Sequence, residues 1–80
     1  MPTEYINILN IINSNPDGLT PFDILYHYQE AKFKPENNTV TMNRKLFSLT
    51  QSKTIRFIDG KEKTYILTEK GKQTLTKETK

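Results

Sequence analysis

The most constraining feature of this sequence is a helix-like stretch followed at once by a β-prone one, in residues 38–57. Met42, Leu46 and Leu49 have the i, i+4, i+7 spacing of one buried helix face. At about 100° per residue, these three side chains fall within about 60° of one another. The spacing therefore predicts a helix over residues 38–52 that packs this face against the rest of the chain.

The other side of this predicted helix carries hydroxyls and cations. It presents Val40, Thr41, Arg44, Phe47 and Ser48, with Lys45 between the two faces and the amides of Asn38 and Asn43 nearby. In the major groove of DNA, Arg and Lys suit guanine, Asn suits adenine, and Thr or Ser suits either. This set predicts a helix that reads the major groove. The alternative is a helix that packs on the core and exposes a solvated polar face.

Two β-prone runs follow, at residues 54–58 and 64–67. The loop between them contains Asp59-Gly60, which is typical of a hairpin turn. Lys61 and Lys63 would make the tip of this hairpin basic. After it, residues 68–76 predict a short last helix with Leu75 as its anchor, and residues 77–80 are expected to fray.

The first half of the chain predicts two more helices. Thr3 is expected to cap the first, whose apolar residues at 5–12 exceed what one face needs. That helix is either central in the core of a monomer or covered by a second copy of the chain. In the second case, this helix or the last helix would form a homodimer interface. Thr20, Pro21 and Asp23 predict the start of a second helix ending near residue 32. The i, i+3, i+6 spacing of Phe22, Leu25 and Tyr28 predicts that these three face the core. Residues 33–38 form a loop, and Asn38 or Thr39 caps the next helix.

Composition places the chain among small globular proteins. Eighty residues predict one domain, here residues 1–76, and the chain has no cysteine and no apolar run of membrane-spanning length. Without a signal peptide, the expected location is the cytoplasm. His27 is the only histidine and has no partner at ligand spacing, so neither a metal nor a cofactor is expected. Paired carboxylates and a glycine-rich phosphate loop are also absent, which argues against an enzyme.

Charge is distributed unevenly along the chain, whose formal net charge is +3. Residues 1–37 carry five acids against two lysines, whereas residues 38–63 carry six cations against two acids. A basic segment joined to an acidic one predicts one side of the molecule that faces a polyanion.

The order of three helices, a hairpin and a short helix resembles the winged helix-turn-helix family. Residues 19–23 (LTPFD) resemble the entry to the second helix of that family. Residues 41–49 (TMNRKLFSL) resemble its recognition helix, and residues 65–71 (YILTEKG) the segment leaving its wing. The resemblance covers nearly the whole chain without assigning a subfamily such as MarR, PadR or ArsR. One departure is Lys53, at a position where the family usually has a glycine between recognition helix and wing.

The resemblance implies an α+β fold, mostly α, that binds double-stranded DNA. Helix 38–52 would lie in the major groove, and wing 54–67 would touch the minor groove or backbone beside it. The contacts carried over are Asn38, Thr39, Thr41, Asn43, Arg44, Lys45, Ser48, Arg56, Lys61 and Lys63. The expected function is a small transcriptional regulator acting as a dimer. The alternative is an interaction module of a phage or mobile element that binds a host protein, for which the exposed Val40 and Phe47 are suited.

Overall fold

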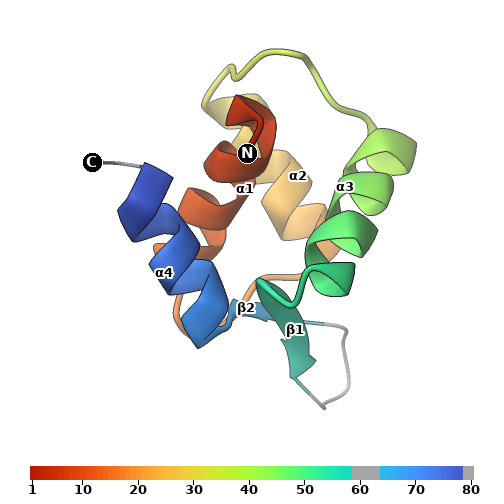
Figure 1. Cartoon of the computed structure of the whole chain (residues 1–80). Helices are drawn as coiled ribbons and strands as arrows, with labels where there is room; N and C mark the ends of the chain where they lie inside the picture. Colours follow the sequence, from red (N-terminus) through yellow and green to blue (C-terminus); the bar gives the residue numbers. More distant parts are fainter. Residues whose placement is uncertain (59–63, 79–80) are drawn as a thin grey trace.

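The computed structural model describes residues 1–58 and 64–78, and these form four helices and a two-stranded antiparallel hairpin (Figure 1). This is the predicted mostly-α architecture with a β-hairpin wing. The elements are α1 (Thr3–Asn13), α2 (Pro21–Glu30), α3 (Thr39–Gln51), β1 (Ile55–Ile58), β2 (Thr64–Leu67) and α4 (Glu69–Glu78).

Helix α1 is the centre of the fold. It lies between α2 and α4 and also contacts β2 (Figure 1). Ile8, Leu9 and Ile12 are buried at its inner side, while Tyr5 and Ile6 are partly buried against the same core. The excess of apolar residues in this helix is therefore explained largely by contacts within one chain, since three other elements cover it.

Helix α2 begins as predicted but turns one aromatic residue outward. The Thr20 side chain accepts the Asp23 N–H and Asp23 accepts the Thr20 N–H, which completes a capping box. Phe22 is 76% exposed, so the prediction that it faces the core is wrong. The buried face is centred on Ile24 and Tyr28, and at about 100° per residue Phe22 lies more than about 100° from that centre.

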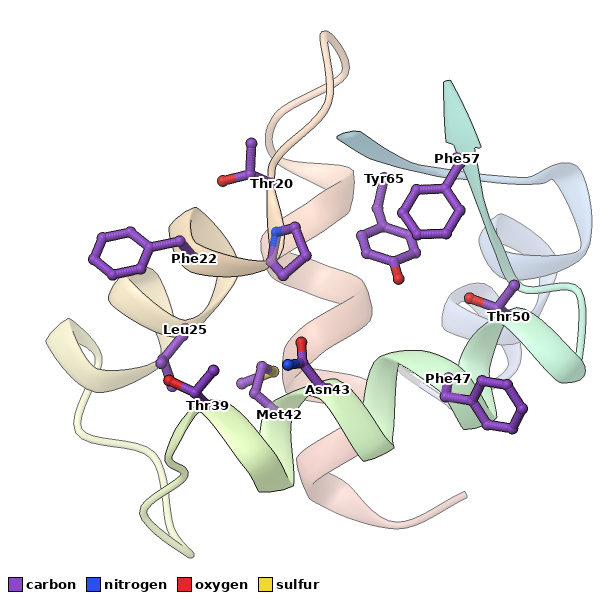
Figure 2. A pocket seen from close by; sticks show the side chains of 11 residues that line it. Thr20, Phe22, Leu25, Thr39, Met42, Asn43, Phe47, Thr50, Phe57 and Tyr65 are labelled. Carbon is purple, nitrogen blue, oxygen red and sulfur yellow. The ribbon is translucent and has the colours of Figure 1, made fainter. Parts of the chain in front are cut away.

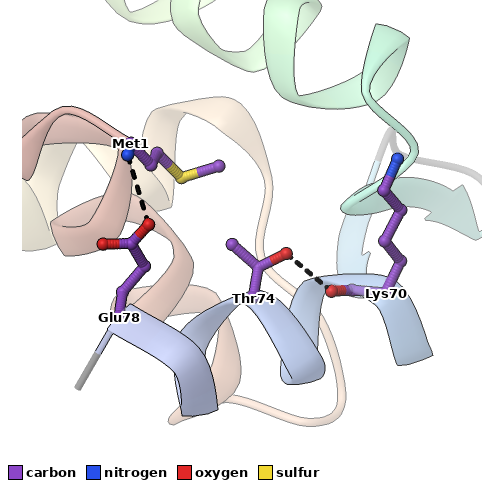
Figure 3. Close-up of polar contacts among 4 residues, drawn as sticks. All are labelled: Met1, Lys70, Thr74 and Glu78. Atoms are coloured by element: carbon purple, nitrogen blue, oxygen red, sulfur yellow. Dashed lines mark hydrogen bonds and ion pairs between the residues drawn. The ribbon is translucent and has the colours of Figure 1, made fainter. Parts of the chain in front are cut away.

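The ends of the chain differ from the prediction in two places. Pro2, not Thr3, precedes α1, because its extended backbone (φ −58°, ψ 147°) presents a carbonyl that accepts the Tyr5 and Ile6 N–H groups. Helix α4 continues to Glu78, so residues 77 and 78 are helical where fraying was expected. The Met1 ammonium lies 3.2 Å from the Glu78 carboxylate (Figure 3), although an exposed pair of this kind contributes little stability.

The junction between α3 and the hairpin is fixed by backbone hydrogen bonds. Lys53 has φ +64°, its N–H donates to the Thr50 carbonyl, and the Thr54 N–H donates to the Leu49 carbonyl. This pattern is a Schellman motif, whose left-handed residue is usually glycine. Thr68, the residue between β2 and α4, secures the junction, because its hydroxyl donates to the Lys53 carbonyl and its N–H donates to the Thr54 carbonyl. These hydrogen bonds hold Lys53 in its left-handed conformation despite the strain. The hairpin that follows pairs Ile55 with Leu67.

Replacing Lys53 with glycine should stabilise the protein. Lysine in the left-handed region costs about 1 kcal/mol more than glycine. For a domain of this size, 1 kcal/mol corresponds to a melting-temperature rise of about 4–8 °C. Thermal unfolding followed by circular dichroism measures this shift. As a matched control, Lys72→Gly inside α4 should lower the melting temperature, since glycine there costs about 1 kcal/mol. A fall in both variants would contradict the account of Lys53.

Stability should also decline in alkaline solution because of two buried phenols, Tyr28 and Tyr65. Burial raises the pKa of both above the ordinary 10.0, since the phenolate loses its hydration. The folded state holds these protons more tightly, so their contribution is complete below pH 10.0 and is lost as the pH rises above it. As the pH rises above 10.0, the melting temperature of Tyr28→Phe should fall less steeply than that of the parent protein. Identical pH profiles for the two proteins would refute this assignment.

Candidate nucleic-acid interface

Helix α3 is held with one face on the core and the opposite face in solvent. Asn38 caps it by accepting the Thr41 N–H at 3.0 Å, and the Thr41 hydroxyl accepts the Asn38 N–H at 3.0 Å. Met42, Leu46 and Leu49 are buried, as their spacing predicts. The helix contains no acidic residue. No acid of the same helix therefore neutralises Arg44 on its exposed side.

The outward face of α3 is the set of exposed residues that lie within about 55° of the direction opposite to the buried face. Arg44 is central in it and, among the described residues, has no hydrogen bond or ion pair with the protein. A guanidinium held on a rigid helix with all its donors unused is suited to a planar acceptor pair from outside the protein. The outward face consists of Val40, Arg44, Phe47, Ser48 and Gln51.

The predicted contact residues at the start of α3 have a structural use. The Asn38 Oδ1 atom and the Thr41 hydroxyl are engaged with each other and with the backbone of the capping box. Thr39 is exposed beside them, at the first position of the helix. These residues fix where α3 begins and leave its first backbone N–H groups at the surface, which is an arrangement that favours a phosphate.

Lys45 does not point outward with Arg44. It is partly buried, and its Nζ donates to the Asn37 Oδ1 atom at 2.9 Å. Asn37 is buried in the loop before α3, and its carbonyl accepts from the Gln29 side chain at 3.1 Å. Lys45 therefore ties α3 to this loop, although it was predicted from sequence as a groove or phosphate contact.

The hairpin supplies one described cation. Arg56 lies on β1 opposite Ile66 and is exposed. Phe57 follows it and stacks on Tyr65 of β2, with ring centroids 4.1 Å apart. Lys61 and Lys63, predicted as wing contacts, lie outside the described residues.

A hollow of about 900 Å³ separates α3 from the first turn of α2 and from the hairpin (Figure 2). Among the residues that the structure describes, its lining is mostly apolar and includes no charged side chain. Asn43 points from α3 toward the hollow, and the Tyr65 hydroxyl points into it from β2. Asn43, predicted as a groove contact at the flank of α3, thus lies beside the outward face and belongs to the rim of this hollow.

Two classes of site find no support in the described residues. No group of three or more His, Asp or Glu side chains there is placed to hold a metal ion. None of the described helices is long and apolar enough to cross a lipid bilayer.

Comparison with known proteins identifies the fold. No protein-family model matches the sequence, and no curated protein matches it. Among solved structures, the chain is similar to Bacillus subtilis PadR in complex with operator DNA, with 26% sequence identity and a TM-score of 0.80. The match covers 98% of this chain and 47% of PadR, so the chain spans about half the length of that protein. With its helices and two-stranded wing in the same arrangement, the chain is a winged helix-turn-helix protein.

Proposed function

We propose that this protein binds double-stranded DNA with sequence preference, with α3 in the major groove and the hairpin against the flanking backbone or minor groove. The observation that carries this proposal is Arg44, which is exposed on the outward face of an acid-free helix and has no partner within residues 1–58 and 64–78. The major groove of B-DNA admits one α-helix, and a guanidinium can bond the O6 and N7 atoms of guanine together. Arg56 on the hairpin adds a cation for the backbone.

The similarity to a PadR protein bound to operator DNA supports the same proposal and extends it to transcriptional regulation. Because the chain matches only about half of PadR, the regulatory activity rests on the shared fold and the outward face alone. We further propose a cytoplasmic protein acting on a two-fold DNA site as a homodimer, since paired half-sites match the symmetry of a dimer. Partly buried Ile6 and Ile11 of α1, and the surface of α4, are the candidate contacts between copies.

The alternative from the sequence, a phage or mobile-element module that binds a host protein, is not favoured by the comparison. It draws on the same exposed apolar residues, Val40 at 60% and Phe47 at 65%. A stoichiometric host protein recovered in place of DNA would support it.

Selection of bound sequences from random duplex DNA tests the proposal, together with the protein's mass in solution. We expect an enriched motif, and affinity for it should fall with salt by about 0.9 in log–log slope for each phosphate contact. A two-fold motif with a dimer mass would support the homodimer, and a single half-site with a monomer mass would reject it. Recovery of no motif, with affinity equal for all duplexes, would overturn the proposal of sequence preference.

A further inference from the structure

Two large apolar side chains stand in solvent on the outward face of α3, on either side of Arg44. Val40 is 60% exposed and Phe47 is 65% exposed. Neither belongs to the core, where Met42, Leu46 and Leu49 of the same helix are each at most 2% exposed. Contact with an apolar group outside the protein would remove this surface from water, which is favourable in proportion to the area covered.

The spacing of these side chains fits successive base pairs. Val40 and Phe47 are seven positions apart, which is about 10 Å along an α-helix axis. Neighbouring bases on one strand are about 3.4 Å apart, so two side chains separated by this length reach different base pairs. Arg44 lies between them, four residues after Val40 and three before Phe47. A base pair read by Arg44 would therefore have one apolar residue directed to each side of it.

Only one base edge in the major groove is apolar. Thymine presents its C5-methyl group there, whereas the other bases present hydrogen-bond donors and acceptors. Resting on the proposed function, we propose that Val40 and Phe47 contact thymine methyl groups on both sides of the base pair read by Arg44. The preferred half-site then holds a guanine–cytosine pair flanked by thymines. These two residues add specificity through burial, beyond the hydrogen bonds of Arg44.

The remaining residues of α3 agree with a nucleic-acid partner for this apolar pair. A docked protein would have to place an acid against Arg44 between the two apolar side chains. Helix α3 also offers no acid with which the cations of such a protein could pair. A duplex supplies phosphates around the groove and a methyl group within it. Gln51 and Ser48 extend the same face with groups that bond base edges.

Replacing thymine with uracil in the selected duplex is the direct test, because it removes the methyl group and keeps every base-edge hydrogen bond. Losing one buried methyl corresponds to about fourfold weaker binding. We expect that loss at each of the two flanking positions when titration is followed by fluorescence anisotropy. In Phe47→Ala, uracil should no longer weaken binding at the thymine that Phe47 contacts, but it should still weaken binding at the thymine that Val40 contacts. In Val40→Ser, the sensitive and insensitive positions should be exchanged.

The controls separate this inference from the function on which it rests. Phe22→Ala removes a phenylalanine of α2 that is 76% exposed, and it should retain the full uracil effect. Because Val40 and Phe47 are largely exposed, both variants should melt like the parent protein. A selected motif bound with equal affinity in thymine and uracil forms would overturn the methyl contacts while leaving DNA binding intact. Absence of any motif would instead overturn the proposed function.

Discussion

Arg44→Ala should lose most of the preference for the selected DNA sequence without losing its fold. A bidentate contact from arginine to guanine contributes about 1–3 kcal/mol of discrimination, which corresponds to about 5–150-fold in relative affinity. The side chain is exposed and has no partner in the described protein, so the melting temperature should stay within the range of ordinary surface substitutions. Competition titrations between the selected duplex and one with the guanine replaced measure the effect.

Two variants show whether the loss comes from geometry or from charge. Arg44→Lys keeps the positive charge but lacks the planar fork, so it should lose discrimination while keeping its salt dependence. Lys77→Ala removes one cation from α4, away from the outward face, and should keep the preference. If Lys77→Ala weakened the preference as much as Arg44→Ala, binding would reflect total charge and the assigned contact would be wrong.

Gly71→Ala should destabilise the protein strongly, against the usual trend for this substitution in a helix. Alanine normally gains about 1 kcal/mol over glycine within a helix. Here a Cβ on Gly71 would overlap the Thr54 carbonyl oxygen and lie 2.9 Å from the Leu67 Cγ atom. Overpacking against backbone costs up to about 3 kcal/mol, which would lower the melting temperature by about 12–24 °C. Calorimetry or circular dichroism measures this change.

The same helix provides the control. Gln73→Ala lies two residues further along α4 at an exposed position and should leave the melting temperature unchanged or slightly higher. The Thr54 carbonyl accepts the Thr68 N–H, so a shifted α4 should also disturb the junction of α3 and β1 and weaken DNA binding. A Gly71→Ala protein that melts at or above the parent temperature would show that this close approach is not required.

The sequence was sufficient for the parts of the fold that depend on local periodicity. Met42, Leu46 and Leu49 fix one face of α3, and the Thr20 capping box fixes the start of α2. The hairpin was predicted from two β-prone runs around Asp59-Gly60, and the described strands pair as expected. In each case neighbouring residues carry the information, because capping and strand pairing across a short loop are short-range interactions.

Predictions failed where burial is decided by other elements. The spacing of Phe22, Leu25 and Tyr28 matched a core face, yet α2 packs on a line through Ile24 and Tyr28, which leaves Phe22 in solvent. Nothing local to Phe22 records which side of α2 meets α1 and α3. The same limit applies to α4, whose end near Met1 depends on where the beginning of the chain lies.

Two features of the candidate interface required the assembled structure. The hollow joins Pro21, Asn43 and Tyr65, which come from three elements far apart in sequence. The bond from Lys45 to Asn37 depends on how the loop before α3 folds back, so periodicity alone could not show that this lysine points inward. Gln51, by contrast, lies about 180° from Met42 at about 100° per residue, so periodicity in the sequence could have identified it as part of the outward face.

Amide chemical-shift mapping by NMR, with the selected duplex titrated into the labelled full chain, locates the protein surface that the DNA covers. The proposed DNA interface predicts that the largest changes fall on the outward face of α3 and around Arg56 of β1. Residues of α1 and of the second half of α4 should change little, apart from any effect of pairing between copies. Largest changes on α1 and α4, with Val40, Arg44 and Phe47 unaffected, would contradict it.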